Sequence, residues 1–386
     1  MDDFGLNEII FIGVILSRML VPLLIIRFPL PAIVACLIID AVDQTVFSAL
    51  APEADLTGYQ NYDKALDIYY LVIAYIATLR NWTNPFALGV ARFLIYYRLI
   101  GVALFELTGI REVLFIFPNT FEYFFIFYES VRLFWDPRRM SNKLVVGAAA
   151  FIWIFIKLPQ EYWIHIAQLD LTDFVQEDIF GVAAGTSWID TFAARPWIVI
   201  VAVVVVAALI YAAYWIMKNK LPPRDRPLTI DADAEPDREV PAERLDAERA
   251  RMAQTFLRPG LFEKLAMIGL VSVIFAKVLG VEAEPLQLTI IVSIVVIANA
   301  GLSTLLERRG FGPTAALRQF VFTGLLNLGI VGVLGLVYRV AGSPFDLTTA
   351  FVYLLLITLL VTLYDRYRPE YVARFAKSDE VVSATT

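Results

Sequence analysis

The feature that most constrains this chain is an uncharged apolar run from Ile198 to Ile210, which reads IVIVAVVVVAALI. Its flanks extend it to the window Trp197–Met217, close to the about 20 residues that a helix needs to cross a hydrocarbon core. Similar windows recur along the whole sequence. A soluble domain of this length has no interior large enough to bury so much apolar surface, so the sequence predicts a multi-pass helical membrane protein.

The composition agrees with this class. Of the 386 residues, 59% are hydrophobic and 18% are charged, whereas soluble domains have about 25% charged residues. The net charge of −6 offers no basic excess to a nucleic-acid partner. Cys36 is the single cysteine, which excludes an intramolecular disulfide, and His165 is the single histidine, so a zinc site of the usual kind is not expected.

Apolar windows of suitable length predict eleven transmembrane helices in an all-α fold. The third window is short and begins in a polar stretch. The windows are Ile9–Ile26, Pro31–Leu50, Leu66–Leu79, Phe86–Leu107, Val113–Phe134, Leu144–Ile164, Trp197–Met217, Leu261–Leu279, Leu286–Leu306, Phe320–Tyr338 and Leu347–Tyr364.

Loop charges orient these helices. The segment Arg132–Lys143 carries four basic residues, and Lys and Arg in short loops mark the cytoplasmic side. Working outward from it, basic loops fall on the same side and acidic loops, such as Asp170–Asp190, on the other. We therefore expect the N-terminus outside and the C-terminus inside, in a protein that is integral to the plasma membrane.

The composition changes over residues 218–260, where Pro, Asp, Glu and Arg replace the apolar residues. This cytoplasmic linker separates an N-terminal bundle of seven helices, residues 1–217, from a C-terminal bundle of four helices and a cytoplasmic tail, residues 261–386. Its first part is expected to be disordered or extended. Its part Ala242–Phe256 is expected to form a short amphipathic helix, either a plain surface element or a docking site for a partner protein.

Ionisable residues near the middle of a predicted helix are the first candidates for function, because charges are costly in the hydrocarbon core. Four of them share a similar depth in the N-terminal bundle: Arg18, Asp40, Arg98 and Glu122. We expect each of the two arginines to contact either Asp40 or Glu122. The C-terminal bundle has only Asn299 and Asn327 at that depth, so it is expected to be a scaffold and the N-terminal bundle to be the working half.

Polar residues at helical spacing extend this set of transport or ion-pair candidates. They comprise Glu129, two turns after Glu122 on a helix that Pro118 is expected to kink, and three further residues: Asp43, Glu161 and His165. Asp63 and Asp67 share a helix face, and they are the candidates for metal ligands, because carboxylates at such spacing can hold Mg²⁺.

Three interpretations stay open. The first is a transporter or ion-conducting protein, coupled to protons or cations, in which a path runs from an acidic outer mouth past Asp40 and Glu122 and leaves by Glu129. The second is an intramembrane metal-dependent enzyme that acts on a lipid or prenyl substrate. The third is a non-catalytic subunit or scaffold, which binds a partner protein or a second copy through the C-terminal bundle or the linker helix. The sequence assigns no catalytic residue and no cofactor; the expected partners are the lipid bilayer and a cation or proton.

Overall fold

The computed structural model describes residues 6–50, 59–169, 171–183, 186–219, 222–235, 239–254, 259–278, 293–295, 297–299, 301–302, 305, 316–340 and 347–375. These residues form helices joined by short connections, and no strand occurs among them. The all-α fold is therefore confirmed for this part of the chain. Most of the expected helix Leu286–Leu306 lies outside the described residues.

Several helices have the length and composition of membrane spans. Within the described residues, four stretches qualify: Ile9–Ile26, Pro85–Thr108, Asn142–Ile166 and Ala350–Phe375. A fifth is added if Trp188–Ala194 and Trp197–Ala212, which meet at 101°, count as one bent span. Such apolar helices are typical of a membrane protein.

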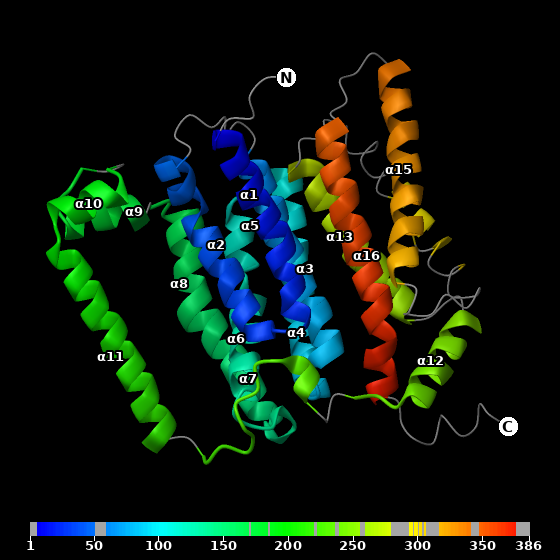
Figure 1. The fold of residues 1–386 in the computed structure, drawn as a ribbon, viewed down its shortest axis with the longest axis horizontal. Helices are drawn as coiled ribbons and strands as arrows, with labels where there is room; N and C mark the ends of the chain where they lie inside the picture. Colours follow the sequence, from blue (N-terminus) through cyan, green and yellow to red (C-terminus); the bar gives the residue numbers. More distant parts are fainter. Residues whose placement is uncertain are drawn as a thin grey trace.

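The N-terminal helices run side by side in alternating directions, as Figure 1 shows. The first are α1 (Leu6–Leu20), which continues as the 3-10 helix η1 (Val21–Ile26), α2 (Pro29–Leu50), α3 (Tyr59–Asn81) and α4 (Pro85–Thr108). We call the end at which α1 begins the amino end. The opposite end is the strap end, named after the strap, residues 222–235, which lies across it.

α3 is the central helix of this bundle. From residue 65 to residue 79, every side chain except that of Asp67 is buried. A helix that is buried on all sides needs apolar residues all round, and α3 has them along this stretch. It begins at Tyr59, before the predicted start at Leu66, because its polar first turns belong to the helix and bring Asp63 and Asp67 against α1.

The predicted helix Val113–Phe134 is broken into α5 (Glu112–Ile116) and α6 (Thr120–Arg132). Pro118 stands in the break; it lacks an amide hydrogen, and its ring disfavours a helical conformation at the preceding residue. Phe117 accordingly has φ −109° and ψ 64°, outside the helical region. The kink expected from Pro118 is thus a full interruption.

The next helical stretch contains two π-helical turns. It consists of α7 (Asn142–Phe151), a π-helical turn (Ile152–Lys157), α8 (Leu158–Glu161) and a second π-helical turn (Tyr162–Ile166). π-helical turns occur frequently at functional sites. After this stretch come the short helices α9 (Leu171–Phe174) and α10 (Trp188–Ala194) and the long apolar helix α11 (Trp197–Asn219).

The C-terminal helices pack directly onto the N-terminal ones. They are α12 (Ala242–Gln254), α13 (Pro259–Val278), α15 (Ala316–Val340) and α16 (Leu347–Phe375), with α13 against α4 and α16 against α3. Glu263 of α13 lies 3.2 Å from Arg92 of α4 and 3.1 Å from Arg368 of α16, and it accepts a hydrogen bond from Tyr75 of α3. This partly buried ion cluster joins four helices from the two halves.

The two asparagines singled out in the C-terminal half bond to each other. Asn299 donates to Asn327 Oδ1 at 2.7 Å, and Asn327 donates to Thr358 Oγ1 at 2.9 Å. Since a polar group in an apolar interior is costly without a partner, these bonds hold the helices of this half in register.

Candidate functional site

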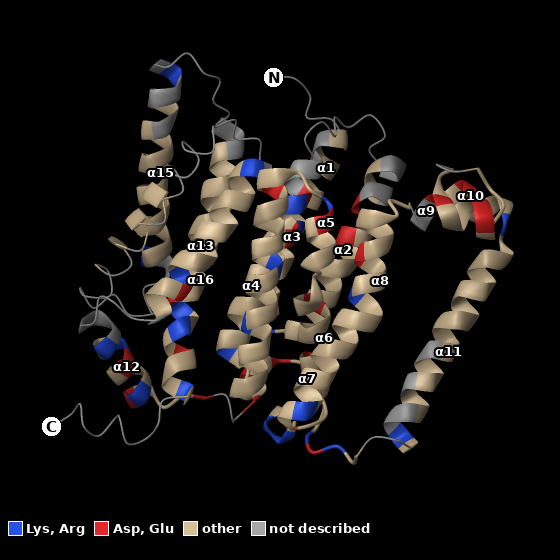
Figure 2. Ribbon diagram, turned by 180° about the vertical axis from the view of Figure 1, so that it is seen from behind, with Lys and Arg blue, Asp and Glu red and all other residues tan. Residues whose placement is uncertain are grey.

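Arg18 lies among four carboxylates. It projects from α1 and is only 5% exposed. Its guanidinium nitrogens lie 2.6 Å from Asp40 and Asp67 and 2.5 Å from Asp43, and they also bond Asp63. With all four carboxylates ionised, this Arg18 cluster has an excess of three negative charges. Figure 2 shows such charged residues inside the bundle, apart from those at its ends.

Helical spacing explains how two neighbouring helices supply these groups. Asp40 and Asp43 are three residues apart on α2, and Asp63 and Asp67 are four apart on α3, so each pair shares one helix face. Asp43 is buried, whereas the other three carboxylates are partly exposed. One oxygen from each of Asp40, Asp63 and Asp67 lies within 4.8 Å of the others, a spacing that suits a metal ion.

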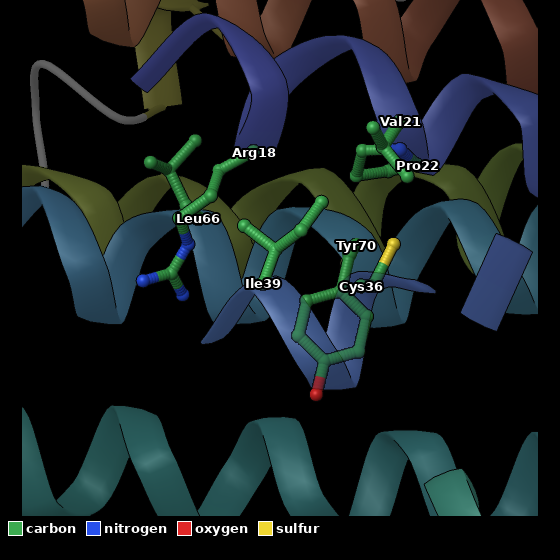
Figure 3. A pocket seen from close by; sticks show the side chains of 7 residues that line it. All are labelled: Arg18, Val21, Pro22, Cys36, Ile39, Leu66 and Tyr70. Atoms are coloured by element: carbon green, nitrogen blue, oxygen red, sulfur yellow. The ribbon is translucent and has the colours of Figure 1, made fainter. Parts of the chain in front are cut away.

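Tyr70 connects the Arg18 cluster to Glu122. It follows Asp67 by one turn on α3, and its hydroxyl donates to Glu122 Oε2 at 3.0 Å. Figure 3 shows the Tyr70 ring beside Cys36 and Ile39, with its hydroxyl pointing away from them. The small hollow at this place is also lined by Arg18, so both polar groups border the same space.

Charged side chains hold the break between α5 and α6. Arg98 of α4 donates to the Phe117 carbonyl at 3.0 Å, and Glu161 of α8 accepts from the Asn119 amide at 3.1 Å. The other Glu161 oxygen lies 3.0 Å from His165 Nε2. The Phe117 carbonyl at the end of α5 and the Asn119 amide at the start of α6 thus each have a charged hydrogen-bond partner. Broken helices of this kind form binding sites in many membrane transporters.

Three buried polar atoms at the break have no hydrogen-bond partner among the described residues: Arg98 Nε, Asn119 Oδ1 and Thr120 Oγ1. Buried polar groups in native structures are almost always paired, and each unpaired one costs about 1–3 kcal/mol. The break is therefore a place where a further polar partner or a second backbone arrangement would lower the free energy.

Charges around the break are balanced, unlike those around Arg18. Lys157 is buried, with its Nζ 3.8 Å from the centre of the Tyr123 ring, and it interacts electrostatically with Glu122 and Glu161. Arg98 lies 3.8 Å from Glu161. Two cations thus face two carboxylates, so this region needs no additional ion to be neutral.

Glu129 lies away from the break, at the strap end of α6. It is fully buried, accepts from Trp82 Nε1 at 2.7 Å and pairs with Arg132. Between it and Glu122 lies a group of fully buried rings, and Trp82 stacks on Tyr128 with 3.7 Å between ring centres. This aromatic layer comprises Trp82, Phe121, Phe124, Phe125 and Tyr128. Fully buried rings therefore fill the interior beside the part of α6 that separates Glu122 from Glu129.

The expected pairing of the two arginines is right for one of them. Arg18 contacts Asp40, as the common depth suggested. Arg98 instead contacts Glu161 and the backbone at the break, and Glu122 takes its hydrogen bonds from uncharged groups. Rise per residue gives the depth of a side chain but not the direction in which it leaves its helix, so depth alone could not assign the partner.

Two contacts of this site could not be predicted from the sequence. Tyr70 follows Asp67 at helical spacing, which places it on the same face but does not identify Glu122 as its partner. A tryptophan that directly follows an apolar helix, as Trp82 follows α3, is typical of an interfacial anchor. Its buried partner Glu129 is 47 positions away, so no local pattern relates them.

Comparisons with models of protein families, with curated proteins and with solved structures found no match. The geometry of the chain's own residues therefore has to carry any inference about its function.

Replacing Arg18 by Gln should destabilise the fold by ~3–5 kcal/mol, because it leaves buried carboxylates unmatched. Adding Asp43→Asn to this variant should restore part of the loss, since one fewer negative charge then repels its neighbours. Denaturant unfolding in detergent measures both, with the exposed Arg111→Gln as a control that should change stability by less than ~0.5 kcal/mol. A double variant less stable than Arg18→Gln would contradict the charge argument.

Gly101 is where α4 approaches the break most closely. A Cβ added there would clash with the Phe117 side chain, so Gly101→Ala should destabilise by ~1–3 kcal/mol through overpacking. Gly89 on the same helix is the matched control: within the described residues nothing lies within 4 Å of a Cβ added there. Gly89→Ala should therefore stabilise the helix by ~0.5–1 kcal/mol. Equal effects of the two changes on denaturant unfolding would show that the break does not depend on this contact.

Proposed function

We propose that this chain is an integral membrane transporter or ion-conducting protein, coupled to protons or cations, which bind at the Arg18 cluster. The observation that carries the proposal is the excess of negative charge around a buried guanidinium. Carboxylates this close repel one another, so bound protons or a cation stabilise the cluster. The partly exposed Asp40, Asp63 and Asp67 give such an ion access.

Glu122 is the second binding site of the proposed path, after the Arg18 cluster. It is buried, bonded to Tyr70 and adjacent to the broken helix, whose interruption supplies a backbone that can rearrange. An intramembrane carboxylate next to such a break is a strong functional candidate. In the proposed cycle an ion or proton passes from the Arg18 cluster to Glu122, while the aromatic layer closes the far side.

The proposed topology is the one expected from the loop charges: eleven spans, the amino end outside and the strap end in the cytoplasm of a plasma-membrane protein. Basic residues at the strap end support it, among them Arg27, Arg80, Arg132 and Arg139. The Arg18 cluster then faces the outer side, and the aromatic layer separates it from the cytoplasm.

Reconstitution into liposomes tests the function. Glu122→Gln should abolish pH-dependent cation or proton flux, because it removes the titratable group from the path, and Glu122→Asp should keep part of it. Glu112→Gln, at an exposed carboxylate near the start of α5, is the matched control and should leave the flux unchanged. Wild-type protein without flux for protons or common cations would reject the proposal, and flux that persists in Glu122→Gln would remove this residue from the path.

One observation favours a second candidate, a metal-dependent enzyme that acts on a lipid or prenyl substrate. Asp40, Asp63 and Asp67 bring three carboxylate oxygens within 4.8 Å of one another. Such a set can bind Mg²⁺, and a metal there would displace Arg18, whose planar guanidinium is suited to a substrate phosphate.

Manganese binding tests the metal site, and turnover compared with ion flux distinguishes the two functions. Paramagnetic resonance should show Mn²⁺ bound to the wild-type protein and lost in Asp63→Asn/Asp67→Asn if the cluster is a metal site, because two of three ligands are removed. Asp173→Asn/Asp178→Asn, outside the cluster, is the control. Metal-dependent turnover of a lipid diphosphate without ion flux would favour the enzyme, and flux without a metal requirement the transporter.

A further inference from the structure

The strap, residues 222–235, is bound to the bundle at several points. Although its polar composition predicts an extended or disordered linker, its acidic residues each meet an arginine at the strap end. The ion pairs are Asp225 with Arg139 at 3.0 Å, Asp231 with Arg27 at 2.8 Å, Glu235 with Arg132 at 2.7 Å, and Asp233 with Arg80; Arg226 of the strap in turn lies 3.2 Å from Asp136.

Backbone contacts show that the strap has a fixed seat. The Ala232 amide donates to the Arg27 carbonyl at 2.8 Å, and the Asp225 amide donates to the Phe134 carbonyl at 3.0 Å. Ala232 and Glu235 are buried. Exposed ion pairs contribute little by themselves, so these buried and backbone contacts distinguish a seated segment from a loosely attached one.

The strap ties together the helices that carry the proposed ion path. Arg27 lies between η1 and α2, Arg80 is in the last turn of α3, and Arg132 is the last residue of α6. The Arg18 cluster is built on α1, α2 and α3, and Glu122 is on α6. Opening the path toward the strap end requires these helix ends to separate, and the strap bridges all of them.

A continuous set of contacts joins the strap to the aromatic layer. Glu235 pairs with Arg132, which pairs with Glu129, and Glu129 accepts from Trp82. Trp82 is the ring that stacks on Tyr128. A displacement of Glu235 would therefore remove one of the two carboxylate partners of Arg132, directly beneath the aromatic layer.

We propose that the strap is an intramolecular latch: when seated, it holds the strap ends of α2, α3 and α6 together and keeps the aromatic layer closed. The inference deepens the proposed transport function, since it assigns a regulatory element to the same path. Release of the latch precedes opening toward the strap end.

The hydrogen bond from Arg27 lowers the pKa of Asp231. A carboxylate whose pKa is lowered by docking stabilises the docked state above its ordinary pKa of about 3.9, and this contribution is lost as the pH falls through the lowered value. Asp231 therefore remains ionised at neutral pH. Since a moderate change of pH does not remove this charge, the latch has to be tested by substitution.

The double variant Asp231→Lys/Asp233→Lys tests the latch, because it places like charges against Arg27 and Arg80. Hydrogen exchange at Ala232 should accelerate by about tenfold or more, as expected for a loss of ~1.4 kcal/mol. In a Cys36→Ala background, a cysteine in place of Thr83, next to Trp82, should react faster with a maleimide added from the strap side. Glu243→Lys/Asp246→Lys changes the charge equally on α12, where Asp246 is 72% exposed, and should alter neither rate.

Two further variants protect the test against misfolding. Asp231→Asn/Asp233→Asn removes the attraction without adding repulsion and should give a smaller acceleration. Arg27→Glu combined with Asp231→Lys reverses one pair, and since Arg27 is 58% exposed, the swap should restore slow exchange relative to Asp231→Lys alone. Unchanged exchange in the Lys variants would overturn the seating, and faster exchange with unchanged reactivity at position 83 would overturn the closing role. Hydrogen exchange and maleimide reactivity can both be measured without ion transport. A failure of the transport proposal is therefore recognised separately, in the liposome assay.

Discussion

A guanidinium in the interior of a helical bundle has to be matched by negative charge, and Arg18 is matched by two residues of α2 and two of α3. This requirement fixes how the first three helices are rotated about their axes: α1 must point Arg18 inward, and α2 and α3 must each turn one acidic face toward it. α3 in turn is the buried helix against which η1, α4, α13 and α16 pack. The match between Arg18 and its carboxylates therefore orients the helix that the rest of the bundle surrounds.

Three regions around the N-terminal helices differ in charge balance. The Arg18 cluster is in excess of negative charge, the region around the break is balanced by Arg98 and Lys157, and the strap end pairs acids of the strap with arginines of the helices. The aromatic layer, whose rings are fully buried, lies between the second and third regions. A region whose charges are balanced needs no bound ion to be neutral. The stability of the Arg18 cluster therefore depends on protons or cations that bind to it.

The sequence predicted the all-α fold of the described residues, because long apolar windows favour helices. It predicted a kink at Pro118 but not the side chains that hold the break, since Arg98 and Glu161 come from other helices and their directions are set by packing. The strap was the hardest part to predict. Asp231 is 204 positions from Arg27, Asp233 is 153 from Arg80 and Glu235 is 103 from Arg132, so a polar stretch that looks like a free linker finds its partners only in the folded bundle.

Occupancy of the Arg18 cluster and the position of α1 are linked in the proposed mechanism. A cation or proton that binds Asp40, Asp63 or Asp67 uses the same oxygens that bond Arg18, so binding weakens the contacts that hold α1 in its present place. α1 continues through η1 to Arg27, where the strap binds both the side chain and the backbone carbonyl. A shift of the last turn of α1, where Arg18 lies, is therefore transmitted through η1 to the place where the strap binds. By reciprocity, a seated strap disfavours the shift and lowers the affinity of the cluster for its ion. One helix segment thus provides a physical connection between ion binding on one side of the aromatic layer and the latch on the other.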